Sequence, residues 1–445
     1  MANYGFVLAQ LSVNKPRKLK KWFRINCKIF CLFDKTPRNQ SPVGPSSKMF
    51  TFRCFLSAAI VLSFNIRNGN GAMSYLQEHY PASVIEDTQL DTAQLLKKYG
   101  YPSETHYVTT SDKYILCMHR IARPKARPLL LMHGLTDSSA TWVLLGPWSS
   151  LGYYLYDQGY DVWMGNVRGN RYSRNHTIYS PDKDRDFWSF SWHEIGYYDL
   201  PALIDYILQQ TGYKKLGYFG HSQGTTSFWV LCSMRPEYNE KVSVMNALAP
   251  VAFMKHIKAP LLGLMRQLLK ISGDIVRELL PHTDILLTNC FRSSAMLNTC
   301  LDYFHQIVGK EVKQLNMTTM PIIFAHVPAG SNRKQWEHYL QLIESDRFCQ
   351  FDYGAKENKK RYGKAQPPDY PLDKITVPVG LYYTYNDYLS SEVDVQRLAK
   401  TLPNVAADVL YPHKKWNHIT MVWGIEARQL AHKQMLDILQ KYEID

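Results

Sequence analysis

The sequence of 445 residues predicts an α/β protein in which a mostly parallel sheet is flanked by helices. The first observation behind this prediction is that short, strand-like apolar runs alternate with longer, helix-like ones. Helices are expected at about 146–158, 192–211 and 223–234. The expected strands before residue 250 are Tyr114–Met118, Leu129–Met132, Asp161–Met164, Leu216–Phe219 and Val242–Leu248. Strands connected through helices in this way pair in parallel and are covered on both faces.

The second observation is that one long insertion interrupts the alternation between about Pro250 and Pro371. Within it, residues 261–271 place Leu and Ile at helical spacing, with Lys and Arg between them. The alternation then resumes with the strand Val377–Tyr383, a helix over 391–402, the strand Ala407–Tyr411 and a final helix over 421–443. We therefore expect a core made of residues 73–252 and 371–445, and an inserted, mainly helical cap or lid domain over 253–370.

A candidate nucleophile lies in the run Gly220-His221-Ser222-Gln223-Gly224, which matches the pattern Gly-x-Ser-x-Gly. This run follows a predicted strand and opens a predicted helix. In the α/β-hydrolase fold such a turn presents the serine Oγ above the sheet, and small flanking residues let the backbone pass. The alternative is a turn serine with a structural role only. The strand and helix on either side favour Ser222 as a nucleophile and the α/β-hydrolase fold as the fold class.

In that fold the acid and the base follow the serine along the chain, each on a loop after a strand. Asp387 follows the strand Val377–Tyr383, and His418 follows the strand Ala407–Tyr411. Asp387 is thus expected to orient His418, which would take the proton from Ser222 and later deliver it to the leaving group. Asp394 is the alternative acid and His413 the alternative base.

The oxyanion of an ester transition state needs hydrogen-bond donors, which this fold supplies from its main chain. The loop after the strand Leu129–Met132 and the residue after the nucleophile make Leu135 and Gln223 the expected donors. His133, in the same loop, is interpreted as a structural residue. The cysteine and histidine spacings do not resemble a zinc site, and the proposed chemistry requires no metal or organic cofactor.

The formal net charge of +14 is concentrated near the N-terminus, because residues 1–48 hold ten Lys and Arg and one acidic residue, Asp34. A nucleic-acid partner therefore loses its main support. The apolar run Cys54–Phe64 suits a signal peptide over residues 49–72, read from Met49. The basic extension 1–48 is then dispensable or belongs to the gene model only. An uncleaved signal-anchor and a mitochondrial transit peptide are the alternatives.

Secretion agrees with two glycosylation sequons, at Asn175 and Asn316. A third, at Asn39, lies upstream of the signal segment and is expected to be silent. Five cysteines follow the leader, so at least one thiol is expected to stay free. Cys290 and Cys300, ten residues apart in one segment, are the favoured disulfide pair.

Further motifs lie along the chain: Tyr99–Pro102, Tyr114–Leu116, Leu131–Leu135, Asp161–Asn170, Phe187–Ser191, Tyr198–Ala202, the serine turn, Asn386-Asp387, Trp416–His418 and Val422–Gly424. Together these motifs resemble the acid lipase family, which includes gastric and lysosomal acid lipases and insect relatives. The resemblance covers most of residues 85–445. It implies a triacylglycerol or steryl ester hydrolase whose cap carries a lid that moves on meeting lipid, and a cap disulfide near Cys290 and Cys300.

The chain departs from the family pattern at two places near the expected site. Tyr385-Asn386 stands where the family usually has a glycine pair before the acid, and Thr420 stands where it usually has Asp. The expected partners are a lipid ester and the lipid–water interface, for a secreted or lysosomal monomer with no stable membrane span. A carboxylesterase of soluble short-chain esters and a non-catalytic lipid-binding protein are the alternatives. The basic, Leu-rich stretch of the cap is either a buried helix or an interfacial lid.

Overall fold

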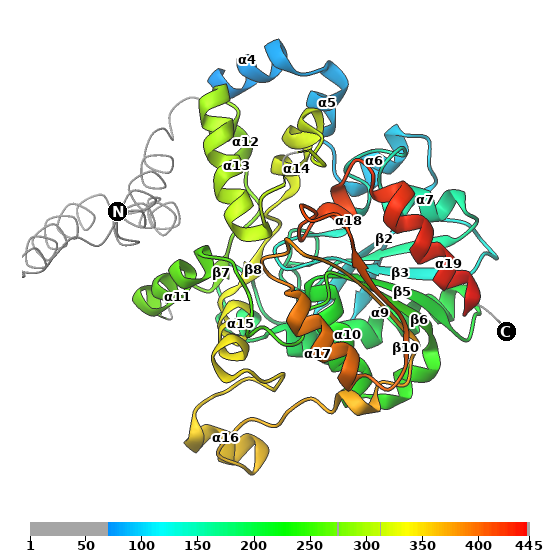
Figure 1. Cartoon of the computed structure of the whole chain (residues 1–445), viewed down its shortest axis with the longest axis vertical. Coiled ribbons are helices and arrows are strands. Elements are labelled where there is room, and N and C mark those ends of the chain that lie inside the picture. Colours follow the sequence, from blue (N-terminus) through cyan, green and yellow to red (C-terminus); the bar gives the residue numbers. More distant parts are fainter. Residues whose placement is uncertain (1–69, 274–275, 312, 443–445) are drawn as a thin grey trace, which may run out of the picture. The chain divides into compact units, whose positions relative to one another are not determined.

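The computed structural model describes residues 70–273, 276–311 and 313–442, and its main feature is one sheet of eight strands (Figure 1). The spatial order is β1-β2-β4-β3-β5-β6-β9-β10. The first two strands run antiparallel to each other and β2 runs antiparallel to β4, while all the other neighbours pair in parallel. The strands are β1 (Ser103–Thr109), β2 (Ile115–Ile121), β3 (Pro128–Met132), β4 (Asp161–Gly165), β5 (Leu216–His221), β6 (Val242–Leu248), β9 (Val379–Thr384) and β10 (Val405–Tyr411). The α/β-hydrolase fold class is confirmed.

Helices cover both faces of this sheet. Successive side chains of the central strands point to opposite faces, so a strand of apolar residues such as β3 makes both faces apolar. Leu129 and Leu131 of β3 enter one apolar cluster, which includes residues of α7 (Leu151–Asp157) and α19 (Lys433–Lys441). Leu130 enters the other, with α9 (Leu200–Thr211), α10 (Gln223–Met234) and α17 (Glu392–Thr401). In Figure 1, α7 and α19 lie at the upper right of the sheet, and α10 and α17 lie below it.

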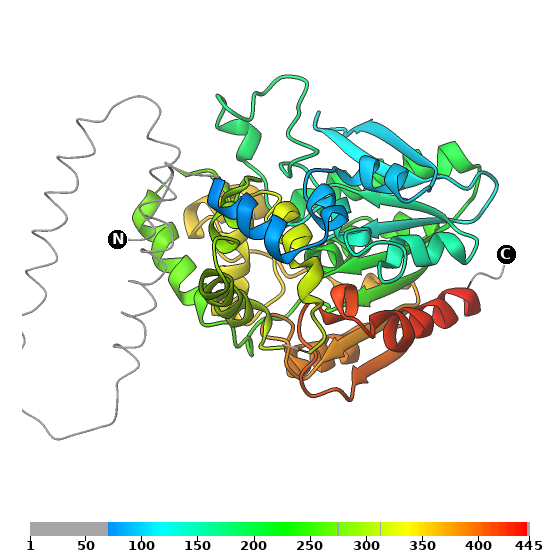
Figure 2. The ribbon, with the colours of Figure 1, turned by 90° about the horizontal axis from the view of Figure 1, so that it is seen from above.

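The segment between β6 and β9 is mainly helical and lies to the left of the sheet in Figure 1; Figure 2 shows it from above. A disulfide joins Cys290 and Cys300, linking α12 to α13. Two short strands, β7 (Glu278–Leu279) and β8 (Ser331–Asn332), pair antiparallel. The helices of this segment are α11 (Leu261–Ser272), α12 (Ile285–Cys290), α13 (Ser294–Val308), α14 (Met320–His326), α15 (Arg333–Ser345) and α16 (Ala355–Tyr362).

Several elements differ from the sequence-based expectations. The helix expected over 146–158 begins only at Leu151, after the turn at Gly146 and Pro147. The helix expected over 421–443 is broken near Gly424 into α18 (Thr420–Trp423), a π-helical turn at Arg428–His432, and α19. The antiparallel strand β1 was not expected, because its alternation is weak and most of its side chains are only partly buried or exposed.

The N-terminal predictions fall mostly outside the described residues. The extension 1–48 lies wholly outside them, and of the signal segment 49–72 only the last three residues are described, within α4 (Asn70–His79). Residues 72–442 belong to one compact unit, to which α5 (Ala82–Asp87) and α6 (Thr92–Lys98) also contribute. Among the described helices, none has the length and apolar character that crossing a bilayer requires.

Candidate active site

Ser222 lies at the turn between β5 and α10, with φ of 52° and ψ of −115°. A non-glycine residue in this region is strained, and the surrounding contacts hold it there. Its N–H donates to the carbonyl oxygen of Leu248, at 3.0 Å. Gly224 permits the tight turn, because a Cβ at that position would overlap the carbonyl oxygen of Met132. The turn therefore has the geometry of a nucleophile elbow.

His418 lies on the loop after β10, and its imidazole is bound to the carboxylate of Asp387 on the loop after β9. Its Nδ1 lies 2.8 Å from Oδ2 and 3.0 Å from Oδ1 of Asp387. Asp387 Oδ1 also accepts the N–H groups of Leu389 and Ser390, at 2.8 and 2.7 Å. Both side chains are buried, with exposed fractions of 5% and 0%. The carboxylate thus assigns the proton to Nδ1 and leaves Nε2 as the basic nitrogen.

The two alternative residues are engaged differently. Asp394, on α17, accepts the His256 backbone N–H at 2.8 Å and lies 2.8 Å from His256 Nδ1. The ring of His413 stacks on Trp416, with centroids 5.0 Å apart. Asp394 is thus bound to His256 and His413 is stacked on Trp416, whereas Asp387 is bound to His418. Asp387 therefore remains the candidate acid and His418 the candidate base.

The two expected oxyanion donors flank the serine turn. Gly134, just before Leu135, passes so close that a Cβ on it would lie 3.3 Å from Ser222 Cβ. Gln223 is the first residue of α10, where backbone N–H groups have no acceptor within the helix. The positive end of the helix dipole also favours a negative charge there.

The loop that carries Leu135 is braced by His133, as its structural interpretation requires. Nδ1 of His133 donates to the Gly134 carbonyl at 2.8 Å, and Nε2 accepts from the Val167 N–H and the Asn170 side chain. Burial lowers the pKa of His133 to about 4, so the ring stays neutral and keeps this donor and acceptor pattern over most of the pH range.

Two polar residues next to this loop were not singled out from the sequence. Asp137 is buried, and desolvation raises the pKa of its carboxyl group to about 7. His221, beside the nucleophile, donates from Nε2 to the His418 carbonyl oxygen at 2.8 Å. Burial, together with the nearby His418, lowers the pKa of His221 to about 3, so this imidazole stays neutral and continues to donate in acid. The only feature of the sequence that pointed to a role for His221 was its place next to Ser222 in the Gly-x-Ser-x-Gly run.

The segment between β6 and β9 also reaches the serine turn directly. The Gln223 side-chain amide donates to the side-chain oxygen of Gln335, a buried residue of α15. Gln335 is in turn held by its own N–H, which donates to Asn332 Oδ1 at 3.2 Å. On the other side, the Ala329 N–H binds the carbonyl oxygen of Thr136, next to Leu135. Sequence periodicity shows only that this segment is helical, so these contacts were not foreseeable.

The departures from the family pattern have clear structural roles. The Asn386 side chain donates to the carbonyl oxygens of Lys310 and Lys415, at 2.9 and 3.0 Å. The Thr420 hydroxyl donates to Asn417 Oδ1 at 2.8 Å and accepts the Asn417 N–H at 3.0 Å. Asn386 therefore ties the candidate acid loop to the base loop, and Thr420 braces the base loop internally. Within the described part of the chain, no cluster of three or more His, Cys, Asp or Glu side chains is arranged to hold a metal ion.

The fold, with Ser222 on the elbow and His418 bound to Asp387, defines an α/β-hydrolase of the serine type. Residues 127–420 match the model of the alpha/beta hydrolase fold, and residues 92–146 match a partial alpha/beta-hydrolase lipase region. The chain is 44% identical to Lipase 1 of Drosophila melanogaster over 81% of its length and 82% of that protein.

Two vertebrate relatives extend the comparison. Gastric triacylglycerol lipase of Bos taurus is 37% identical, over 79% of this chain and 92% of the relative. Lysosomal acid lipase/cholesteryl ester hydrolase of Homo sapiens is 33% identical, over 81% and 93%. The chain therefore belongs to the acid lipase family of the α/β-hydrolase superfamily.

Proposed function

We propose that this protein is a serine hydrolase of neutral lipid esters that acts through an acyl-enzyme on Ser222. The observation that carries the proposal is the paired hydrogen bond between His418 Nδ1 and the Asp387 carboxylate, behind a serine held at positive φ on the elbow. This arrangement supplies an oriented general base and a partly exposed nucleophile.

The reaction follows from these positions. Nε2 of His418 takes the proton as Ser222 Oγ attacks the ester carbonyl, and Asp387 stabilises the resulting imidazolium. The main-chain N–H groups of Leu135 and Gln223 stabilise the oxyanion, a contribution worth about 2.7–4 kcal/mol for one donor in a comparable enzyme. The imidazolium then protonates the leaving alcohol. Water, activated by the same imidazole, releases the fatty acid.

The proposed substrates are triacylglycerols, steryl esters or both. The names of the bovine and human relatives, triacylglycerol lipase and cholesteryl ester hydrolase, support this class. We assign the cap to residues 253–370 and propose that α11 meets the lipid–water interface. Its exposed Ile271 and the neighbouring Lys270 suit an apolar surface with anionic head groups, and the exposed Arg266, which pairs with Glu344, adds a second cation on the same helix. The protein is proposed to act as a monomer.

We further propose that the working protein starts at Met49, loses residues 49–72 as a signal peptide, and is secreted or lysosomal. The terms gastric and lysosomal in the names of relatives support this assignment. Asn175 and Asn316 are both exposed, as glycan acceptors must be. Peptide N-glycosidase treatment should lower the mass of secreted protein, and N-terminal sequencing should begin near Ala72. A secreted chain that retains residues 1–60 would reject the signal peptide.

The central test combines activity with labelling. Purified mature protein is assayed from pH 4 to 8 against triolein, cholesteryl oleate and short p-nitrophenyl esters, and a fluorophosphonate probe is mapped by peptide mass spectrometry. We expect long-chain hydrolysis, labelling of Ser222, and loss of both in Ser222→Ala with an unchanged melting temperature. Activity restricted to soluble short-chain esters would indicate a carboxylesterase. Labelling elsewhere, or hydrolysis retained in Ser222→Ala, would reject the assignment.

A further inference from the structure

We propose that a segment of the cap forms part of the catalytic apparatus, by clamping the loops that carry Asp387 and His418. The segment is residues 308–311 and 313–315, which we call the strap, and Asn386 is its main positioning partner. The inference rests on the proposed function and adds to it a regulatory dependence of the triad on the cap.

The strap begins where α13 ends, and the last carbonyl groups of a helix have no donors within it. Here the triad loops supply those donors. The Val308 carbonyl oxygen accepts the backbone N–H of His418 itself, at 3.1 Å. The Gly309 carbonyl accepts from the Asn417 side chain at 2.7 Å, and the Lys310 carbonyl accepts from the Asn386 side chain at 2.9 Å. Three successive carbonyl groups of the cap thus accept hydrogen bonds from the candidate base, His418, and from the residues that precede the base and the acid, Asn417 and Asn386.

The approach of the strap is close enough to require glycine at its centre. Gly309 has φ of 100°, a conformation that other residues rarely adopt. A Cβ at this position would overlap the carbonyl oxygen of Asn386 and would lie 3.1 Å from Asn417 Cβ. The strap is therefore in direct contact with both loops, and no side chain separates them.

The far end of the strap is attached to the chain that follows His418. The Ile425 N–H donates to the Gln314 carbonyl oxygen at 2.9 Å, and the Glu426 N–H donates to the Gln314 side chain at 3.1 Å. Leu315 and Gly424 form an isolated antiparallel bridge. The loop from 417 to 426 is consequently bound to the cap at both of its ends.

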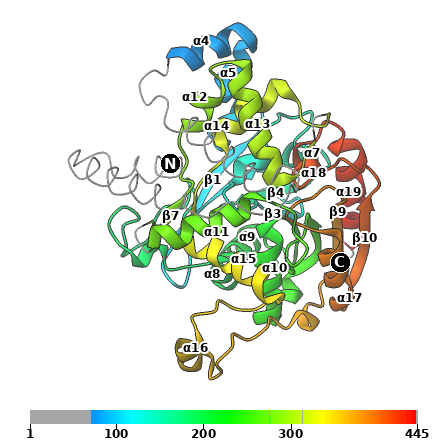
Figure 3. The same cartoon turned by 60° about the vertical axis from the view of Figure 1, so that its left-hand side comes forward.

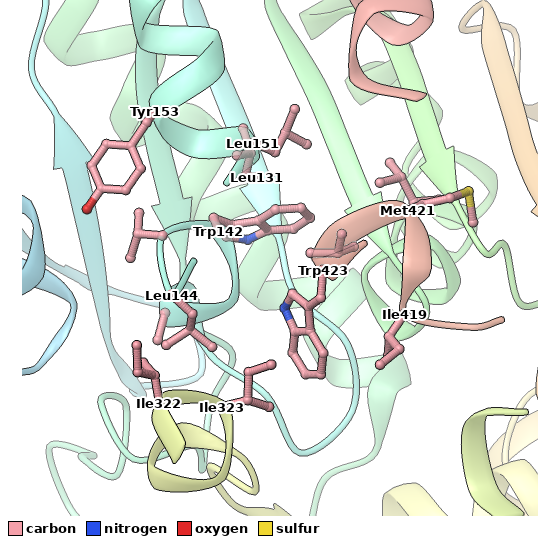
Figure 4. Close-up of a cluster of buried hydrophobic side chains, with 14 of the residues drawn as sticks. Leu131, Trp142, Leu144, Leu151, Tyr153, Ile322, Ile323, Ile419, Met421 and Trp423 are labelled. Atoms are coloured by element: carbon pink, nitrogen blue, oxygen red, sulfur yellow. The ribbon is translucent and has the colours of Figure 1, made fainter. Parts of the chain in front are cut away.

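The loop from 417 to 426 is also held in place by apolar packing. Trp423 stacks against Phe304 of α13, with ring centroids 6.5 Å apart, and its Nε1 donates to Thr141 Oγ1 at 3.0 Å. Figure 4 shows Trp423 between Trp142 of the core and Ile323 of α14. Figure 3 shows α13, α14 and α18 gathered on one side of the sheet. The segment after His418 is thus held between the cap and the core.

This arrangement makes the strap a positioning element, since moving it moves the His418 main chain. A displacement of a catalytic group by about 1 Å can cost roughly 100-fold in rate. Opening the cap at this side would misplace the imidazole, so we infer that lid movements which preserve activity occur at α11 and leave the strap in place.

One of the three polar contacts of the clamp, that to the Lys310 carbonyl, can be removed without changing a triad residue, by Asn386→Ala. The matched control is Asn404→Ala, because Asn404 also follows β9 along the chain and donates from its side chain to a backbone carbonyl, that of Thr376, at 3.0 Å. Asn404 precedes β10 and His418 follows it, so the control substitution lies at the opposite end of that strand from the loop that carries His418. The measurements are kcat and KM on a soluble p-nitrophenyl ester, the rate of fluorophosphonate labelling, melting temperature, and hydrogen–deuterium exchange.

We expect Asn386→Ala to lower kcat and the labelling rate by about tenfold or more, with KM changed less than about twofold, given the sensitivity of rate to geometry. Peptides covering 308–311 and 415–420 should exchange faster. Asn404→Ala should lower the melting temperature by about as much as Asn386→Ala does. It should leave kcat, the labelling rate and the exchange of these peptides unchanged. In a His418→Ala background, Asn386→Ala should cause no further loss of residual activity, because the group it positions is gone.

Wild-type kcat and unchanged exchange in Asn386→Ala, while Ser222→Ala is inactive, would overturn the strap proposal and leave the proposed function intact. Equal losses of kcat in the Asn386 and Asn404 variants would also overturn it, since they would indicate general destabilisation. An inactive wild-type protein would instead refute the proposed function. The exchange measurement then decides whether the strap holds the 415–420 loop, because it does not depend on hydrolysis.

Discussion

Asp394 binds His256, with its Oδ1 2.8 Å from His256 Nδ1, and so takes part in a contact separate from that of Asp387 with His418. Asp394 is buried, whereas the His256 side chain is about half exposed. The contact joins α17 to the chain that enters the cap. The two carboxylates therefore lie on neighbouring segments but have different partners.

This difference leads to a direct comparison of two isosteric variants. Asp387→Asn should lower kcat by about 10⁴-fold, because the amide cannot hold His418 in the reactive tautomer. Asp394→Asn should change kcat by less than about tenfold and should lower the melting temperature. Steady-state kinetics on a soluble ester and thermal unfolding of both variants provide the measurement. The reverse pattern would make Asp394 the catalytic acid.

The contact between Gln335 and Gln223 predicts a role for the cap at the oxyanion side. Gln335→Ala leaves the buried Gln223 amide without its acceptor, a change that costs about 1–3 kcal/mol. Because the side chain and the donor N–H belong to the same residue, we expect Gln335→Ala to shift the Gln223 main chain and to lower kcat by about tenfold. Gln341→Ala, on the exposed side of the same helix, is the control. Equal kcat values in the two variants would argue against this role.

The buried Asp137 predicts a pH dependence of stability. Its pKa of about 7 lies above the usual carboxyl range near 4, so between these values the native state binds the proton more tightly than the unfolded state. Stability contributed by this group is present below about pH 4 and declines as the pH rises to about 7, by on the order of 1 kcal/mol per pH unit.

The test for Asp137 is unfolding by denaturant at several pH values. Asp137→Asn, which imitates the neutral carboxyl group, should show a flatter dependence between pH 4 and 7 than the wild-type protein. Parallel curves for the two proteins would show that another group governs this range.

Removal of the Cys290–Cys300 disulfide should destabilise the cap. The bond closes a loop with a sequence separation of 10, for which chain entropy gives about 2–3 kcal/mol. Exchanging both residues for Ala should lower the melting temperature and increase hydrogen exchange in 285–308, with a smaller effect on β3 and β5. Cys232→Ala, at a buried free thiol, serves as the control for cavity formation. Uniform exchange changes across the core would contradict a local effect.

Much of the candidate site could be predicted because its signals are local. The Gly-x-Ser-x-Gly run contains its own turn, and the helix expected at 223–234 has the bounds observed for α10. The order of the acid and the base follows from the ends of two strands in the sequence. Less was predictable for β1, whose polar, exposed pattern resembles a loop, and for the C-terminal helix, which breaks where Gly424 and the strap meet.

The sequence by itself determined the fold class, the nucleophile elbow, the chain order of the candidate triad and the family, because each depends on residues adjacent in the chain or on their periodicity. The tertiary structure alone decided which carboxylate binds His418, where Asn386 donates, and how the cap attaches to the site. Those choices depend on hydrogen-bond distances between segments far apart in sequence, and the donors and acceptors acquire partners only when the sheet and the cap are packed together.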